Sequence, residues 1–150
     1  MFSKSCEYAI RACVVIYQKS AEGKLVNIKE LSVLTDTPEP YLAKTMQILS
    51  KAGLVQSHKG PGGGFFFEKD TELMLVQIVH AIDGDDIFTK CGLGLKQCSE
   101  KNPCCLHYQF KSIRKNIKQM LMENSVSFLA RGLSEGNCTA RNIVDQMLIE

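Results

Sequence analysis

Apolar positions at helical spacing mark the beginning of the chain. From Ser3 to Ser20 there is neither Gly nor Pro, and the apolar residues recur three and four positions apart, which predicts a first helix with one buried stripe. Asn27, followed by Glu30 three residues later, has the form of a capping box and predicts a short second helix over residues 28–34. The stripe of the first helix consists of Tyr8, Ala9, Ala12, Cys13 and Ile16.

A third helix is predicted from Pro38 to Ala52. Thr37 is expected to cap it and Pro38 to occupy its first position, while Gly53 ends it. One face carries apolar residues and the other polar ones. Two short helices that follow a longer one across a tight turn are typical of a helix-turn-helix, although other small helical bundles share this periodicity. The apolar face holds Leu42, Met46 and Leu49, and the polar face holds Tyr41, Lys44 and Gln47.

The segment after the third helix predicts a β-hairpin. Residues 54–57 form an apolar-to-polar run, residues 60–64 are Gly-Pro-Gly-Gly-Gly, and residues 65–67 are three Phe. A hairpin at this place is a wing, and its glycine-rich tip lets the backbone approach a phosphate. A nucleotide-binding loop is the alternative, but the Gly-Lys-Ser/Thr ending is missing. The candidate DNA-binding residues are therefore Tyr41, Lys44, Gln47, His58, Lys59, Gly60, Gly62 and Gly63.

Two more helices are predicted beyond the wing, over residues 70–82 and 109–131. His80 in the former lies among apolar residues and is expected to be packed or half-exposed, and the acids at 83–86 to form a solvated turn. The latter is predicted to be the longest helix, with a stripe that packs on a second copy and its basic side solvated. A weak last helix follows from Thr139. The stripe comprises Phe110, Ile113, Ile117, Met120, Leu121 and Phe128.

These elements make the expected fold mainly α with a small β-hairpin wing. The predicted organisation is a winged helix-turn-helix unit over residues 1–82, a cysteine-rich loop over 83–108, and a dimerisation helix with a C-terminal tail over 109–150. No apolar run approaches the roughly 20 residues that cross a bilayer, and the N-terminus lacks the sections of a secretory signal. We therefore expect a cytoplasmic protein without a membrane partner, whose seven Cys are reduced.

The net charge of +2 conceals an uneven distribution. Residues 1–60 carry eight Lys and Arg against five Asp and Glu, residues 61–90 carry two against six, and residues 91–150 carry eight against five. The predicted DNA-reading segment is therefore basic, so the nearly neutral total does not argue against a nucleic-acid partner.

Four of the seven Cys lie within fifteen residues, in a hydrophilic segment with little to fold it. Thiolates that converge on a metal would supply that order, because metal binding acts as folding energy. Zinc and iron–sulfur clusters both accept thiolates, although the long gaps favour a cluster; free thiols are the bland alternative. Cys104 and His107 are expected to share one face of the opening helical turn, with Cys105 turned away. The ligand candidates are Cys91, Cys98, Cys104 and His107, with Cys105 as a substitute.

Together these residues resemble a known family. Tyr8-Ala9, Tyr41-Leu42, Gly53-Leu54-Val55, the run from Ser57 to Phe65, Ile82-Asp83-Gly84 and the cysteine loop are similar to the Rrf-two-type winged-helix transcriptional regulators. The resemblance implies a bacterial homodimer that binds double-stranded DNA and holds one iron–sulfur cluster in each protomer. It implies Cys91, Cys98 and Cys104 as ligands. The fourth ligand is His107, which we favour, or Glu7 of the partner subunit.

Two features depart from the family pattern. The gap between Cys91 and Cys98 is six residues where relatives usually have five, and Cys105 is an extra thiol, which leaves a 2Fe–2S or a 4Fe–4S cluster open. Lys59 stands where Arg is common, and Lys lacks the bidentate fork.

The expected function is a transcriptional regulator, a repressor, whose affinity for a palindromic operator responds to nitric oxide, redox state or cluster supply. One alternative is a winged-helix regulator with a zinc or cluster-free thiol sensor. Another is a thiol enzyme in which His107 activates Cys104. We expect no enzyme activity and no small-molecule substrate.

Overall fold

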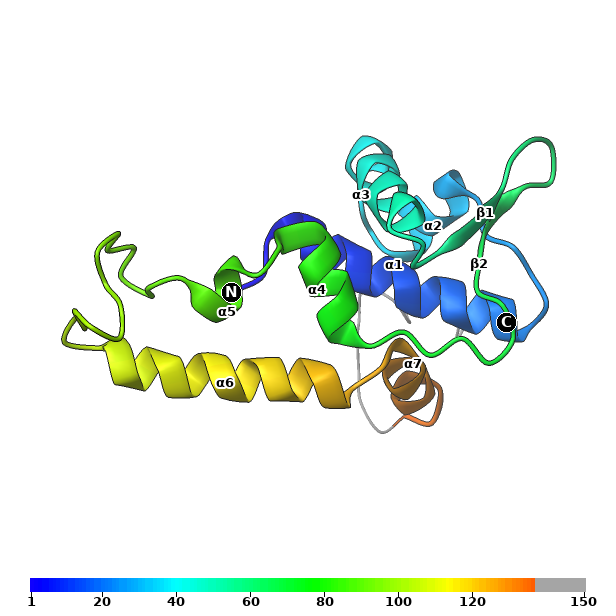
Figure 1. Cartoon of the computed structure of the whole chain (residues 1–150). Coiled ribbons are helices and arrows are strands. Elements are labelled where there is room, and N and C mark those ends of the chain that lie inside the picture. Colours follow the sequence, from blue (N-terminus) through cyan, green and yellow to red (C-terminus); the bar gives the residue numbers. More distant parts are fainter. Residues whose placement is uncertain (137–150) are drawn as a thin grey trace.

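The fold is mainly helical with one small hairpin, as predicted. A computed structural model describes residues 1–136, and in this range it has seven helices and one two-stranded antiparallel sheet (Figure 1). No helix among these residues is long and apolar enough to cross a membrane. In chain order the elements are α1 (Lys4–Ala21), α2 (Ile28–Leu34), α3 (Glu39–Lys51), β1 (Gln56–His58), β2 (Gly64–Phe66), α4 (Leu75–Asp83), α5 (Asp86–Thr89), α6 (His107–Glu123) and α7 (Val126–Ser134).

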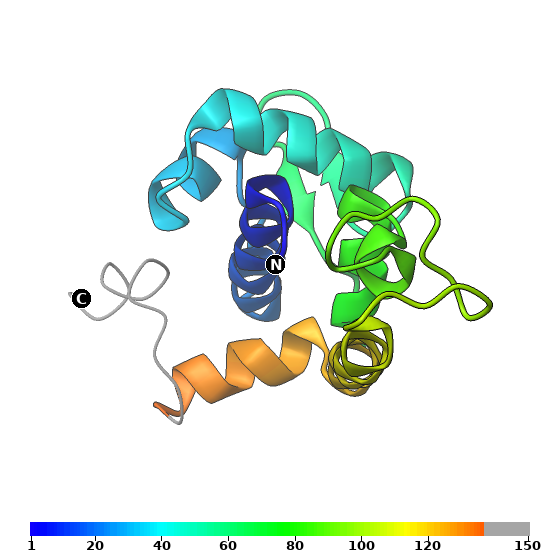
Figure 2. The ribbon, with the colours of Figure 1, turned by 90° about the vertical axis from the view of Figure 1, so that its left-hand side faces the viewer.

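Helix α1 is the centre of the core. It packs against α3, α4 and α7, and Figure 2, which looks along α1, shows α3 on one side of it and α6 and α7 on the other. Burial of the predicted stripe is confirmed, with Tyr8 half-buried at its edge. Burial also raises the pKa of the Cys6 thiol to about 12 and raises the pKa of Cys13, so both behave as structural thiols. The buried residues of α1 are Cys6, Ala9, Ala12, Cys13, Val14, Val15 and Ile16.

The helix-turn-helix consists of α2 and α3. Asn27 caps α2 as predicted, because its side chain accepts a hydrogen bond of 3.0 Å from the Glu30 N–H. The predicted cap of α3 is wrong. The Thr37 hydroxyl is buried in the turn and donates to the Thr35 carbonyl at 3.0 Å, and Pro38 takes the capping position. The same carbonyl accepts a 3.0 Å hydrogen bond from Arg11, which ties the turn to α1.

The wing is formed, but its first strand begins later than predicted. Gln56 pairs with Phe66 and His58 with Gly64, while Val55 is buried in the core instead. Phe65 extends the pairing to Val26, since the two residues exchange hydrogen bonds of 2.8 and 3.1 Å. The base of the wing is therefore attached to the segment that precedes α2.

Replacing Gly64 with Ala is expected to destabilise this attachment. A Cβ at position 64 would lie 2.7 Å from the Val26 carbonyl oxygen, so backbone must move. We expect a loss of about 1–3 kcal/mol in the free energy of unfolding, as for other overpacked sites. Thermal unfolding measures it, with Pro61→Ala at the exposed tip of the wing as the control. An unchanged midpoint for Gly64→Ala would contradict the close approach.

Helix α4 begins at Leu75 rather than at Asp70. The preceding segment forms a bridge with residues 124–126, in which the Leu75 N–H donates to the Asn124 carbonyl at 3.0 Å and the Val126 N–H donates to the Leu73 carbonyl at 2.8 Å. This long-range pairing holds residues 73–74 extended and so delays the helix. His80 is more exposed than predicted, and its Nδ1 lies 2.9 Å from an Asp85 carboxylate oxygen.

The predicted helix over 109–131 is two helices. Asn124 is extended and Ser125 caps α7 by accepting from the Phe128 N–H, so α6 has 17 residues and α1, with 18, is longer. Only part of the predicted apolar stripe is exposed and so available to pack on a second copy. Leu121 and Ile117 pack against the core of this chain, whereas Ile113, Met120 and Phe128 are 47–55% exposed. The predicted helix from Thr139 and Cys138 lie outside the described residues.

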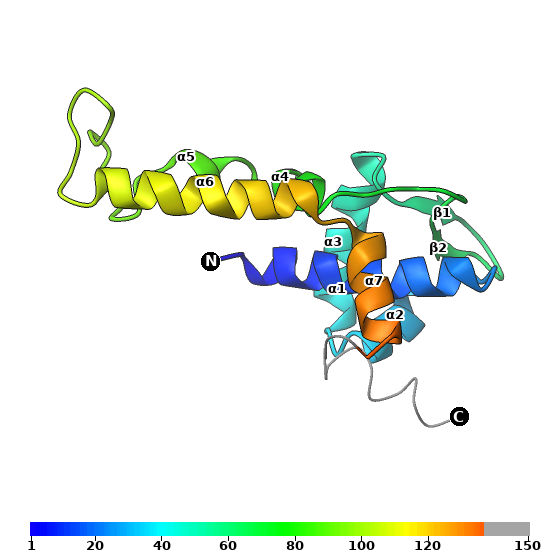
Figure 3. The same cartoon turned by 90° about the horizontal axis from the view of Figure 1, so that it is seen from below.

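Helix α6 and the cysteine loop form an arm. Seen from below in Figure 3, α6 extends away from the helix-turn-helix, α7 lies across α1, and the loop is at the far end of α6. The predicted domain boundaries at residues 82 and 108 stay predictions.

Candidate metal centre and nucleic-acid interface

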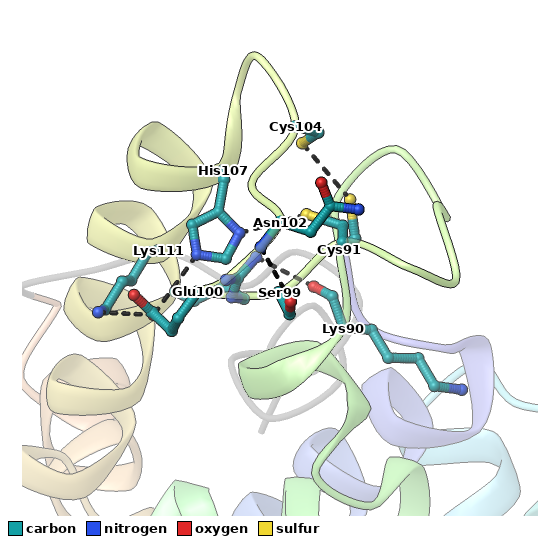
Figure 4. A network of polar contacts seen from close by, with 10 residues as sticks. Lys90, Cys91, Ser99, Glu100, Asn102, Cys104, His107 and Lys111 are labelled. Atoms are coloured by element: carbon teal, nitrogen blue, oxygen red, sulfur yellow. Dashed lines mark hydrogen bonds and ion pairs between the residues drawn. The ribbon is translucent and has the colours of Figure 1, made fainter.

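Three thiols converge at the far end of the arm. The Sγ atoms of Cys91, Cys98 and Cys104 all lie within 4.8 Å of one another, and those of Cys91 and Cys104 are 3.8 Å apart. All three residues are half-buried, and Figure 4 shows Cys91 and Cys104 facing each other across the loop. These are the three thiols that the resemblance implies as ligands, and no other group of three or more potential ligands in the described part of the chain is as close.

His107 lies beside this set. Its Nδ1 is 3.2 Å from the Cys98 Sγ, and its ring is buried at 9% exposure. The two residues His107 and Cys104 do not lie in the first turn of the helix as predicted, because α6 begins at His107; they are joined by a turn just before it, in which the His107 N–H donates to the Cys104 carbonyl at 3.0 Å. Cys104 therefore faces Cys91 while His107 faces Cys98.

The substitute ligands lie elsewhere. Cys105 is exposed and is not among the converging thiols. Glu7 is on α1, where its carboxylate forms an ion pair of 2.8 Å with Lys4 in the same protomer.

Helix α6 holds the first end of the cysteine loop. Arg114 donates a 3.0 Å hydrogen bond to the carbonyl of Lys90, the residue before Cys91. The Phe110 ring lies so close to Gly92 that a Cβ there would be 2.4 Å from a ring carbon. Arg114 belongs to the basic side of the helix, which was predicted to be solvated; its contact with the loop was not predicted, and Gly92 was the available signal for it.

Glu100 connects the middle of the loop to α6. Its carboxylate forms an ion pair of 2.7 Å with Lys111 and lies 3.4 Å from the His107 Nε2 (Figure 4). Lys111 and then His107 hold the pKa of Glu100 below its usual range. The Nε2 atom is buried and has no hydrogen-bond partner, so the 3.4 Å contact is electrostatic only. The first two turns of α6 thus fix the loop at residues 90–92 and at Glu100.

The thiols differ in acidity. The backbone N–H groups of Leu95 and Leu93 lower the pKa of Cys91 to about 7. The backbone N–H of Cys104 favours the Cys98 thiolate, but burial and the thiols of Cys104 and Cys91 outweigh it and raise the pKa of Cys98. A thiolate is the form of Cys that binds metal and that reacts with electrophiles. Cys91 is therefore able to do both near neutral pH.

Cys91 is therefore expected to alkylate faster than Cys98 in the metal-free chain at pH 7. Its labelling rate by iodoacetamide should fall about fivefold from pH 7 to pH 6, because its pKa is about 7 and protonation removes the thiolate. Peptide mass spectrometry after timed labelling at pH 6, 7 and 8 measures both rates. Equal rates at all three values would contradict the difference in acidity.

The converging groups fit a thiophilic metal centre. A tetrahedral ion with bonds of about 2.3 Å separates its sulfur ligands by about 3.8 Å, which is also the separation of Cys91 and Cys104. His107 has a buried Nε2 without a hydrogen bond, and its Nδ1 is beside Cys98. Two ligand pairs, Cys91 with Cys104 and Cys98 with His107, are thus available.

The predicted DNA-binding residues lie on the opposite side of the molecule from α7. On α3, Tyr41, Lys44 and Gln47 are exposed, with Tyr41 at 64%, whereas Leu42, Met46 and Leu49 are buried. Figure 1 shows α3 and the wing projecting on the same side.

At the wing the His58 ring stacks on Phe66, with ring centroids 5.0 Å apart. Lys59, Gly60 and Gly62 are exposed and Gly63 is half-buried. Gly60 and Gly62 have φ of 93° and 74°, which side chains rarely adopt, so the tip turns tightly. The structure therefore presents a polar helix face and a narrow basic wing together, while contact of single residues with DNA stays a prediction.

Known proteins share this fold and sequence. The Rrf2 family, described as iron-dependent transcriptional regulator, matches residues 2–132. An HTH-type transcriptional regulator of Aquifex aeolicus is 31% identical over 86% of this chain and 90% of its own. The HTH-type transcriptional regulator IscR of Photorhabdus laumondii is 29% identical over 81% of this chain and 74% of its own.

Solved structures show the same fold. A structure of T. potens IscR has a TM-score of 0.72 at 20% identity and covers 93% of both chains. CymR, the global cysteine regulator of B. subtilis, has a TM-score of 0.71 at 21% identity and covers 87% of this chain and 96% of its own. An IscR and a cysteine regulator thus share this fold, so the fold alone does not identify what this chain senses.

These relatives are regulators rather than enzymes, which agrees with the expectation of no enzyme activity and contradicts the thiol-enzyme alternative. The family match extends over the helix-turn-helix, the wing and the arm. The chain belongs to the Rrf2 family of DNA-binding, winged-helix transcriptional regulators.

Proposed function

We propose that the chain is a homodimeric transcriptional repressor whose affinity for an operator depends on an iron–sulfur cluster. The observation that carries this proposal is the convergence of three thiols at the end of an arm whose helix packs on the DNA-binding unit. The IscR relatives support it by similarity. Cys91, Cys98 and Cys104 would hold the cluster, with His107 as the fourth ligand.

A bound cluster would supply iron that reacts with nitric oxide or oxidants. The arm's own contacts then provide the connection to DNA. Arg114 holds the backbone beside Cys91, and Lys118 lies 5.7 Å above the Phe88 ring, which joins α6 to α5. Helix α4 packs against α6 on one side and α3 on the other. A change in the loop would thus displace α4 and alter how α3 is presented.

The exposed side of α6 fits a second copy of the chain. Gln109, Ile113, Asn116 and Met120 are all exposed and are spaced by four, three and four residues, which is the spacing of a coiled-coil seam. Two α3 helices in such a dimer would read half-sites about one helical turn apart on a roughly palindromic operator.

A zinc or thiol sensor on the same winged-helix dimer is the second candidate. The 3.8 Å separation of the Cys91 and Cys104 sulfurs supports this candidate too, because the distance suits a single tetrahedral ion as well as one iron of a cluster.

Anaerobic purification followed by metal analysis tests both candidates. A cluster predicts visible absorbance with iron and acid-labile sulfide in equal amounts, and binding to selected DNA that changes when nitric oxide is added. One zinc per protomer without visible absorbance would support the second candidate and contradict the first. Neither metal, with DNA binding unaffected by oxidants, would contradict both.

A further inference from the structure

Two apolar side chains lie near the beginning of the otherwise polar exposed face of α3. Successive residues of a helix are separated by about 100°, so Pro40, Ala43 and Gln47 lie within about 60° of one another, on the side of α3 opposite the buried residues Thr45 and Leu49. Pro40 and Ala43 are both exposed, and Lys44 flanks them. The side that would face the floor of a major groove therefore begins with two adjacent side chains that can neither donate nor accept a hydrogen bond.

The backbone at this place adds little hydrogen-bonding capacity. Pro40 has no N–H group, and the N–H groups of Tyr41 and Leu42 already donate to the Pro38 carbonyl at 3.1 Å. The beginning of α3 thus offers few donors to phosphates or to base edges. Pro in a first helical turn and Ala within a helix also favour the helix itself, and this is the structural role that a test must separate from base reading.

Only one group in the major groove suits an apolar contact. Base edges present hydrogen-bond donors and acceptors at each base pair, and the C5-methyl of thymine is the exception. We infer that Pro40 and Ala43 contact thymine methyl groups and so select T·A pairs within each half-site. This inference rests on the proposed function, because it takes α3 as the helix that enters the groove. Lys44 and Gln47 would bind polar groups on either side of the methyl contact.

Deoxyuridine provides the test, since it differs from thymidine only by the missing methyl group. A duplex is first selected from a randomised library by binding to the full chain, and each thymine of the half-site is then replaced by uracil. Replacement at the contacted position should weaken binding by about fourfold for one buried methyl group. The affinities of the wild type and of Ala43→Gly for both duplexes complete a thermodynamic cycle.

The cycle distinguishes a contact from a structural effect. If Ala43 touches the methyl group, Ala43→Gly binds the thymine and uracil duplexes almost equally. Ala52→Gly is the control, because it makes the same change at the C-cap position that follows α3, away from the proposed contact, and should keep the full preference for thymine. If circular dichroism reports loss of helix in Ala43→Gly, Ala43→Gln replaces it, because Gln favours a helix and puts a polar amide in place of the apolar contact, so the preference for thymine should again be lost.

Two results would overturn different statements. An enriched duplex whose affinity does not change with uracil at any position, or changes equally in Ala43→Gly and the wild type, overturns the methyl contact and leaves the regulator intact. A selection that enriches no sequence overturns the proposed operator binding itself.

Discussion

Replacing Cys98 with Ala is expected to abolish cluster binding and the response of DNA affinity to nitric oxide. Cys98 lies between the other two thiols and His107, so its removal opens the site in the middle. Loss of a group that merely orients a ligand already costs about 10- to 100-fold in metal affinity, and loss of a ligand should exceed that. Absorbance and iron content after anaerobic reconstitution measure the effect, and DNA binding with and without nitric oxide measures its consequence.

Cys105→Ala is the matched control for this experiment. It removes a thiol from the same loop, but one that is exposed and outside the converging set. We expect it to keep the wild-type spectrum and iron content. A normal spectrum for Cys98→Ala combined with a lost spectrum for Cys105→Ala would move the ligand set to Cys105 and contradict the assignment.

Replacing Ile113 with Glu should convert the proposed dimer into a monomer and weaken operator binding by about 10²- to 10⁴-fold. Ile113 is 52% exposed on α6, so the charge would cost little in the isolated chain and much in an apolar interface. Binding of one half-site instead of two forfeits the effective concentration that linkage provides. Sedimentation equilibrium gives the oligomeric state, and titration of a two-half-site duplex gives the affinity.

Lys115→Glu tests whether any new acid on α6 has this effect. Lys115 is exposed on another side of the helix, two residues further along. It should remain dimeric, with at most a modest loss of affinity from the changed charge. A dimer that persists in Ile113→Glu would place the second copy on a different surface.

Local sequence signals predicted most of the DNA-binding unit. The stripe of α1, the Asn27 cap and the glycine-rich turn each depend on residues close in sequence, and all three are present in the structure. The errors occurred where distant segments decide the local conformation. Helix α4 begins late and α6 ends early because residues 73–75 pair with residues 124–126, and no periodicity in either segment reports a partner about 50 residues away.

The candidate metal site was predictable to a similar extent. Clustering of Cys in a polar loop identified the three thiols, because few other roles account for such residues there. The contacts that position these thiols were not predicted. Arg114 and Phe110 fit the helical pattern of α6, and nothing in that pattern indicates that residues 90–92 pack against them.

The bridge between residues 73–75 and 124–126 also bears on how sensing chemistry can change within this fold. Because of this pairing, the chain leaves the core at residues 73–75, forms the arm, and returns to the same place at residues 124–126. The entropy lost on closing such a loop grows only logarithmically with its length, about 0.6 kcal/mol for each doubling. Insertion or deletion of residues between the thiols should therefore hardly change the free energy of unfolding of the helix-turn-helix. The six residues between Cys91 and Cys98 lie within this arm, so the length of that gap can change while the helix-turn-helix stays folded.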